Sequence, residues 1–366
     1  MKEKILTRNF CFCFLALLSI SMVMFMLIAT VTQYATEFGA AASLAGLVSG
    51  MYVLGGMFSR LAAGNLLERF GWKRVALFAA AFHFAACCFY LFVNNLYVFI
   101  IARFLHGMGF GVTSCAIVTI GMSILPKSRF GEAGGYFMMG TTISVGIGPF
   151  IGGHVYDAFG SGGCFLCAMI MSFLTWLFMF FVELRNADAD PSSFVHERKK
   201  EPFIRRIIEP DAILASSVTG LTALGYVGIM AFYRIYAVET GLERAFSYFF
   251  LLYAGLLLFF RPMAGKIQDR YGNKYVCIPG IIAQTVGLIL LSLRPCVVTL
   301  VICAVGCAMG YGSLNSACNV IVCRRAPASR RSYAVTTFYL CCDVAMGIGP
   351  AVLGAVASLG GYHVMY

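Results

Sequence analysis

Two ionisable side chains stand deep inside apolar stretches of the chain, where a charge is expensive. Arg103 lies in the stretch FIIARFLHGMGFG, and Asp343 lies in FYLCCDVAMGIGP. An arginine at the centre of a membrane helix costs at least ~2.5 kcal/mol, so Arg103 is expected to face a cavity or a partner. A carboxyl group such as that of Asp343 can exchange a proton with its surroundings. Both residues are therefore candidates for proton coupling or substrate contact, and a structural ion pair is the alternative for each.

Other polar side chains in apolar stretches are further candidates for the same site. Arg234 stands near one end of its stretch, from which a long side chain can also reach the lipid headgroups. His106 and His83 could titrate near pH 6.5, or they could be packed and hydrogen-bonded. Asn315 and Asn319 are four residues apart, so they share one helix face and could line a cavity. The sequence shows no cluster with the spacing of a metal site or of a catalytic pair.

The composition indicates which elements must position these side chains. Of the 366 residues, 60% are hydrophobic and 12% are charged, and the mean hydropathy is +0.84. A soluble domain is only about half apolar, so a soluble fold is excluded. A membrane-spanning helix needs about 20 apolar residues, and the chain is therefore predicted to be an all-α polytopic membrane protein with eleven spans. These lie near residues 10–31, 44–63, 75–93, 97–121, 133–154, 164–184, 211–237, 246–264, 276–293, 297–321 and 332–357.

Basic residues divide the connections between the spans into two sets. Most of the 27 Lys and Arg lie in the N-terminus or in alternate connections, whereas the opposite connections hold only Arg244 and Arg294. By the positive-inside rule, the N-terminus and every basic connection are cytoplasmic. The net charge of +11 thus indicates topology. Nucleic-acid binding is excluded because the charges are spread over separate segments.

The second half of the sequence repeats the first. A shift of 201 positions aligns RLAAGNLLERFGWKRV, which begins at Arg60, with RPMAGKIQDRYGNKYV, which begins at Arg261. The same shift places GMGFG over AMGYG, and one GIGP over another, without a gap. Parallel repeats of this kind are related by an axis along the membrane normal, and they place a cavity between the two halves.

The repeat also predicts the domain boundaries. An N-terminal six-helix bundle is expected at residues 1–184, a polar cytoplasmic linker at 185–209, and a C-terminal bundle at 210–366. By the same offset, the sixth span should recur near residues 365–385, whereas the chain has 366 residues. We therefore expect the twelfth helix to be missing from the C-terminal bundle.

The segment GNLLERFGWKR resembles the loop signature G-x-L-A-D-R-x-G-R-K of the major facilitator superfamily, and GKIQDRYGNK resembles it again in the second half. The resemblance implies a gating loop, whose acidic side chain can meet a helix N-terminus or an arginine. A solvated turn is the alternative interpretation. The corresponding residues are Gly64, Leu66, Glu68 in place of Asp, Arg69, Gly71 and Lys73, and then Gly265, Asp269, Arg270, Gly272 and Lys274.

The fourth and fifth spans resemble two further patterns of this family. Arg103, Gly107 and Gly109 match R-x-x-Q-G-x-G, with His106 in place of Gln, and the family associates this arginine with proton coupling. The antiporter signature G-x8-G-x3-G-P-x2-G-G implies proton-coupled export. Helix packing through small residues, with a bend at the proline, is the alternative. The residues that match the antiporter signature are Gly135, Gly148, Pro149, Gly152 and Gly153, with Ser144 in place of the second glycine.

Together, these features predict a secondary active transporter of the drug:proton antiporter type, which works by alternating access as a monomer in the plasma membrane. Its expected partners are a small amphipathic molecule or drug, protons and the lipid bilayer. The sequence has no G-x-x-x-x-G-K-[ST] loop for a nucleotide, and no cofactor, metal or enzymatic activity is expected. Two alternatives stay open, namely an uptake porter for a small metabolite and a non-functional truncated remnant.

Overall fold

All of the regular structure in the described residues is helical. The computed structural model describes residues 4–38, 42–184 and 208–366, so nearly all of the predicted linker lies outside the described part. The long helices are α1 Arg8–Glu37, α2 Ala42–Phe70, α3 Trp72–Phe89, α4 Leu96–Ser123, α5 Phe130–Phe181, α6 Pro210–Thr240, α7 Glu243–Tyr271, α8 Lys274–Leu293, α9 Val297–Cys307, α10 Ser313–Arg325 and α11 Arg331–Gly360. The shorter segments are α12 Tyr362–Met365, η1 Tyr90–Phe92, η2 Lys127–Arg129, η6 Ala308–Gly312 and η7 Ala328–Arg330.

The longest helix, α5, contains two of the predicted spans. Its 52 residues are interrupted at Gly160, where φ is 65° and ψ is −166°. Glycine has no Cβ, so it adopts a positive φ without steric cost. The break lies between the spans predicted at 133–154 and 164–184. The sharp change of direction therefore occurs at Gly160, whereas Pro149 stands within a stretch whose torsions are helical.

Glycines with positive φ show that the repeat extends to the backbone. Four of the five such glycines in the described residues form two pairs that are 201 positions apart. Gly71 (88°) pairs with Gly272 (96°), and Gly160 (65°) pairs with Gly361 (82°). The first pair connects α2 to α3 and α7 to α8, and Gly361 precedes α12 as Gly160 precedes the second part of α5. The duplication predicted from the sequence is therefore also a duplication of turns.

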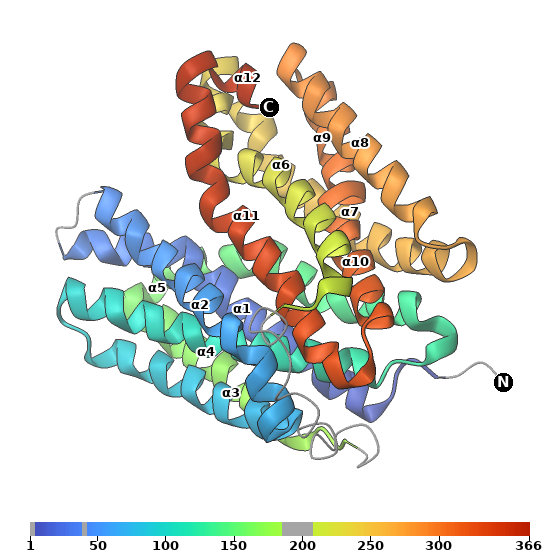
Figure 1. The fold of residues 1–366 in the computed structure, drawn as a ribbon. Coiled ribbons are helices and arrows are strands. Elements are labelled where there is room, and N and C mark those ends of the chain that lie inside the picture. Colours follow the sequence, from blue (N-terminus) through green and yellow to red (C-terminus); the bar gives the residue numbers. More distant parts are fainter. Residues whose placement is uncertain (1–3, 39–41, 185–207) are drawn as a thin grey trace.

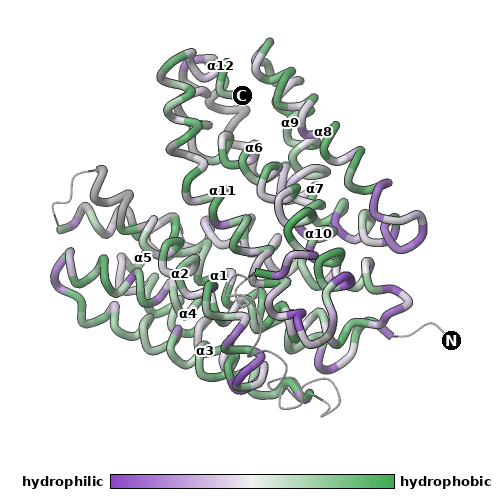
Figure 2. Tube along the Cα trace, in the orientation of Figure 1, coloured by the Kyte–Doolittle hydropathy of each residue, from purple (hydrophilic) through white to green (hydrophobic). Residues whose placement is uncertain are grey.

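Most of the long helices have the length and hydropathy of membrane spans. Within the described residues, eight helical stretches are long and apolar enough to cross a membrane, and one of these contains both spans of α5. Helices α2 and α7 are not among these eight stretches, but each has 29 residues, more than the about 20 that a crossing requires. Figure 2 shows hydrophobic residues along the helices and hydrophilic residues gathered near helix ends. Every predicted span thus corresponds to a helix, as expected for a polytopic membrane protein.

The helices form two groups, α1–α5 and α6–α12, each with its own buried apolar clusters. Figure 1 shows that the groups meet along α2 and α11 and along α5 and α7, and that they diverge toward the C-terminal ends of α1 and α11. A further apolar cluster is built mainly from the first group and takes in Val320, Cys323 and Val335 from the second. The contact between α5 and α7 extends from Gly131 beside Gly265 to Gly146 beside Ala254, so the halves are packed together along part of their length.

The tenth span is interrupted, which its apolar pattern did not predict. Between α9 and α10, the π-helical segment η6 contains Gly310 with ψ of −112°. The side chain of Gln284 on α8 is inserted here, because its Oε1 accepts a hydrogen bond from the N–H of Tyr311 and its Nε2 donates to the carbonyl of Thr222, both at 2.8 Å. Inserted side chains of this kind commonly interrupt helices.

Candidate functional site

A buried ion pair joins the two halves of the molecule. Arg60 on α2 contacts Asp343 on α11 through Nη1 and Oδ2, and their side chains are only 4% and 16% exposed. The second guanidinium nitrogen of Arg60 donates a hydrogen bond to Ser114 Oγ at 3.1 Å. The guanidinium carbon also lies 5.5 Å from the ring centre of Phe110 and 5.0 Å from that of Tyr339. Asp343 is therefore held by an arginine from the other half of the chain.

The charge state of this pair affects how firmly the halves adhere. Two opposite charges inside a protein offset their desolvation only while both are present, and removing one partner costs about 3–5 kcal/mol. A proton on Asp343 removes its negative charge and leaves Arg60 without a counter-charge. The Arg60 Nε atom has no hydrogen-bond partner among the described residues. The guanidinium group is held there by Asp343 and Ser114.

The corresponding place in the other half has the arginine but lacks the acid. Arg261 on α7 is 201 positions from Arg60 and crosses to the first half, where its Nη1 donates to the carbonyl of Met138 at 2.5 Å. Its Nε donates to the carbonyl of Gly312 at 3.0 Å. Thr142, which corresponds to Asp343, donates its hydroxyl hydrogen to the same Met138 carbonyl at 3.5 Å. The fold therefore accepts a neutral residue here, and the acid is specific to one half.

The signature loop of the second half also contacts the first half. Both Oδ atoms of Asp269 accept hydrogen bonds from the start of α5, from the N–H groups of Gly131 and Glu132 at 2.8 Å each. Arg324 on α10 donates to the same carboxylate at 2.5 Å. We call Asp269 with these three donors the Asp269 latch. A carboxylate at a helix N-terminus is stabilised by the free N–H groups and the helix dipole. This is the kind of contact that the sequence predicted for the gating loop.

Glycines let the helices of the two halves approach closely beside the latch. A Cβ placed on Gly265 would lie 2.2 Å from the carbonyl oxygen of Gly131, and one on Gly64 would lie 2.7 Å from the ring of Tyr333. Glu68 in the first-half loop is 3% exposed and accepts a hydrogen bond from Trp72 Nε1 at 3.3 Å. The small residues in both signatures thus have a steric explanation.

The basic residues of the two signatures lie toward the surface. Arg69, Arg270 and Lys274 are exposed, and Lys73 is half-buried. Arg69 and Arg270 lie over the neighbouring rings of Phe70 and Tyr271 at 5.2 and 5.1 Å, within their own half. Their place at these helix ends agrees with a role in topology, whereas Asp269, Gly64 and Gly265 make contacts between the halves.

Arg103 lies inside the N-terminal half, away from the contact between the halves. Its side chain is 1% exposed. Its Nε donates to the carbonyl of Val48 and its Nη1 to the hydroxyl of Tyr90, both at 3.4 Å, and its guanidinium lies 4.6 Å from the ring centre of Tyr52. No carboxylate in the described part of the chain is within ion-pair distance. The Nη2 atom has no hydrogen-bond partner there.

Two histidines complete this buried group, which we call the Arg103 cluster. The Tyr90 hydroxyl and His106 Nδ1 are 2.8 Å apart, and the rings of His106 and His83 have centres 4.2 Å apart. His83 Nδ1 is 2.6 Å from Ser172 Oγ. The residues at the same positions of the repeat are neutral: Ala304, Cys307 and Gln284 correspond to Arg103, His106 and His83. Charge in the Arg103 cluster is therefore a property of one half alone.

The remaining predicted residues differ in their surroundings. Asn315 and Asn319 are buried on α10, where Asn315 Nδ2 is 4.0 Å from Cys342 Sγ and Asn319 Oδ1 accepts from Cys323 Sγ at 3.6 Å. Asn315 thus contacts α11, whereas this contact of Asn319 is within α10, and both side chains are buried. The side chain of Arg234 lies outside the described residues.

The glycines of the antiporter signature mostly serve close packing. A Cβ on Gly135 would lie 2.7 Å from the carbonyl oxygen of Arg261 on α7. On Gly148 and Gly152 it would lie 2.8 Å and 2.6 Å from atoms of Phe25 and Met26 on α1, whereas Gly153 has open space around it. This signature therefore holds α5 against α1 and, at Gly135, against the other half.

Comparison with known proteins agrees with this two-halved helical architecture. The family model of the Major Facilitator Superfamily matches residues 13–350. An uncharacterized MFS-type transporter of Methanocaldococcus jannaschii is 25% identical over 91% of this chain and 87% of its own length. The staphylopine export protein of Staphylococcus aureus is 22% identical over 90% and 84%. The multi-drug resistance efflux pump PmrA of Streptococcus pneumoniae is 22% identical over 83% and 76%.

Solved structures share the same fold. The proton:xylose symporter XylE aligns with a TM-score of 0.76, covering 98% of this chain and 92% of its own at 13% identity. The fold and the inter-half contacts define a polytopic membrane transporter built from two parallel repeats. The chain belongs to the major facilitator superfamily, and it is accordingly a transporter and not an enzyme.

Proposed function

We propose that this transporter exports a small amphipathic molecule in exchange for protons. Two of its relatives are named for export or multidrug efflux, and the antiporter signature on α5 supports the same direction. We further propose that it lies in the plasma membrane with a cytoplasmic N-terminus, since the basic connections all fall on one side. The substrate and the protons would use the two conformations in turn.

The Arg60–Asp343 ion pair is the observation that carries this proposal. It is buried, it crosses between the halves, and its repeat counterpart contains Thr142 in place of the acid. Protonation of Asp343 would release Arg60 and weaken the contact between α2 and α11. The halves would then separate at the end that bears the signature loops, and deprotonation would allow them to close again.

Transport measurements in proteoliposomes with an imposed pH gradient test this assignment. A panel of amphipathic dyes, beginning with ethidium, is first assayed with the unaltered protein. We expect Asp343→Asn to lose at least about 90% of gradient-driven transport. An increase of only about 1.4 kcal/mol in the barrier of the coupled step already lowers its rate tenfold. Exchange of dye across the membrane without a gradient should persist. Asp157→Asn, which removes an exposed carboxylate, is the matched control.

Several outcomes would contradict the proposal. Gradient-driven transport that survives in Asp343→Asn would remove this residue from the coupling step. Movement of solute in the same direction as protons would favour an uptake porter. Absence of gradient-driven transport for the whole panel in the unaltered protein would contradict export of amphipathic molecules.

A further inference from the structure

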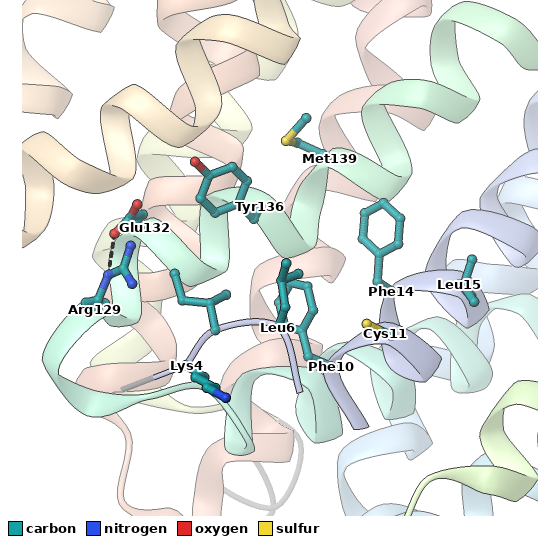
Figure 3. A pocket seen from close by; sticks show the side chains of 11 residues that line it. Lys4, Leu6, Phe10, Cys11, Phe14, Leu15, Arg129, Glu132, Tyr136 and Met139 are labelled. Carbon is teal, nitrogen blue, oxygen red and sulfur yellow. Dashed lines mark hydrogen bonds and ion pairs between the residues drawn. The ribbon is translucent and has the colours of Figure 1, made fainter. Parts of the chain in front are cut away.

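A groove of about 840 Å³ lies between the first residues of α1 and the first turns of α5. Figure 3 shows that its lining is divided, with Lys4, Arg129 and Glu132 toward one end and apolar side chains, including Phe14 and Met139, toward the other. Leu6, which also lines the groove, is 75% exposed. The groove is therefore open to the surroundings of the protein rather than sealed inside one half.

The charged end of the groove carries a surplus of positive charge. Its one lining carboxylate, Glu132, is paired with Arg129 at 2.7 Å and with Lys266 of α7 at 3.5 Å. No carboxylate of the described residues lies within ion-pair distance of Lys4. Together with Asp269 and Arg324, which lie against the same start of α5, two acids are surrounded by four cations, so an anionic group would be attracted to this end.

We propose that this groove binds one anionic phospholipid from the leaflet that faces the N-terminus. The phosphate would lie between Lys4 and Arg129, and one acyl chain would follow Phe10, Phe14 and Met139. Charge at one end and an apolar surface along the rest match the two parts of a phospholipid. Anionic lipids are enriched in the cytoplasmic leaflet, where basic residues next to the membrane attract them. This inference rests on the proposed cytoplasmic position of the N-terminus, and it does not depend on the direction of transport or on proton coupling.

The headgroup would lie beside a contact between the two halves. The carboxylate of Glu132 binds Arg129, while its backbone N–H donates to Asp269 of the Asp269 latch. A phosphate on Arg129 would compete with Glu132 for the same guanidinium. The proposed lipid therefore occupies a place from which it can affect the start of α5.

Native mass spectrometry of the intact protein tests the proposal with defined lipids. The protein is equilibrated in detergent with equal amounts of phosphatidylglycerol and phosphatidylcholine that carry the same acyl chains. We expect the unaltered protein to retain phosphatidylglycerol in preference, and Lys4→Gln combined with Arg129→Gln to lower that retention at least fivefold, given two lost basic contacts. Lys4→Gln alone should give a smaller loss. Lys127→Gln is the matched control, because Lys127 is exposed in the same turn as Arg129 and does not line the groove.

A second variant tests the apolar part of the groove. Cys11 lines it and is exposed, so Cys11→Trp should fill the groove and lower the retention of both lipids. Unchanged phosphatidylglycerol retention in Lys4→Gln and in the double variant would overturn the proposal. So would equal retention of the two lipids by the unaltered protein. Displacement of the lipid by ethidium at micromolar concentration would assign the groove to the transported substrate instead.

Discussion

Three arginines are buried in the part of the protein that the structure describes, and they are stabilised in three different ways. Arg60 is paired with the carboxylate of Asp343, Arg261 donates to two backbone carbonyls, and Arg103 lies among a carbonyl and two tyrosines. Of these three arginines, only Arg60 has an acidic partner among the described residues. Because a buried cation without a counter-charge is costly, Arg103 is expected to be retained for function rather than for stability.

A substitution at Arg103 separates these two roles. Arg103→Met should leave the Tm unchanged or raise it, because it removes a buried cation that has no counter-charge and Met keeps much of the length of the arginine side chain. Gradient-driven transport should nevertheless fall. Thermal unfolding in detergent, followed by the fluorescence of Trp72 and Trp176, gives the Tm. A Tm that drops by more than about 5 °C would show instead that Arg103 is a structural residue.

The partner of Asp343 shows what the sequence could and could not reveal at this scale. An acid inside an apolar stretch is visible in the sequence, and a structural ion pair was the alternative interpretation of Asp343. Arg60 stands inside the second predicted span and recurs as Arg261, which could have marked it as a candidate. The pairing itself joins residues that are 283 positions apart, and no local pattern encodes such a contact.

At the scale of the elements, close packing of α7 against the start of α5 depends on glycines. A Cβ on Gly265 would come within 2.2 Å of a backbone oxygen, which has little freedom to move. Gly255 lies on the same helix α7 with nothing within 4 Å of its Cβ position. These two glycines therefore differ in whether the fold can accept a methyl group.

Alanine at the two positions should give opposite results. Gly265→Ala is expected to push α7 from α5 and to cost about 1–3 kcal/mol, as overpacking usually does. Transport should fall roughly tenfold, because the closed contact between halves is then less populated. Gly255→Ala should behave like the unaltered protein in the same proteoliposome assay. Equal transport by both variants would contradict the proposed packing contact.

The Asp269 latch makes a separate prediction about the connection between α10 and α11. Asp269→Asn keeps the shape of the side chain but removes the charge that Gly131, Glu132 and Arg324 share. Charge-assisted hydrogen bonds are worth about 1.5–3 kcal/mol each, so their weakening should free Arg324. Tryptic cleavage after Arg324 should then become about tenfold faster.

The control for this experiment is another aspartate at the start of a helix. Asp211 is exposed in the first turn of α6, and Asp211→Asn should leave the cleavage rate unchanged. If Asp269→Asn and Asp211→Asn were cleaved at the same rate, the latch would not hold this connection in solution.

The helices were predictable from the sequence, but the irregular positions within them were only partly so. Apolar stretches about 20 residues long placed every span, and the offset of 201 positions related the two halves. The break at Gly160 lies between two apolar stretches, so the sequence predicted two spans there. The insertion of Gln284 into η6 was not predictable, because it depends on a side chain from α8 that reaches a different helix.

At the scale of the whole molecule, two polar contacts join the halves near the signature loops. The Arg60–Asp343 pair joins α2 to α11, and the Asp269 latch joins α7 to α5. These two helix pairs correspond in the repeat, and Figure 1 shows the halves diverging from them. Under the proposed mechanism, Asp343 in one of the two contacts exchanges a proton, which would link protonation to the separation of the halves.

Distances between spin labels on the two halves test this central claim most directly. Labels carried by encoded non-natural residues would be placed at Lys73 and Lys274, which are 201 positions apart beside the signature loops, and in a second sample at Asn94 and Arg294 beyond the opposite helix ends. The distances are compared at about pH 8 and about pH 5, because the proposed mechanism requires Asp343 to take up a proton and release Arg60 as the pH falls. We predict that the Lys73–Lys274 distance then increases and the Asn94–Arg294 distance decreases. Asp343→Asn should show the low-pH distances at every pH. A pH response that is the same in Asp343→Asn as in the unaltered protein would contradict the account.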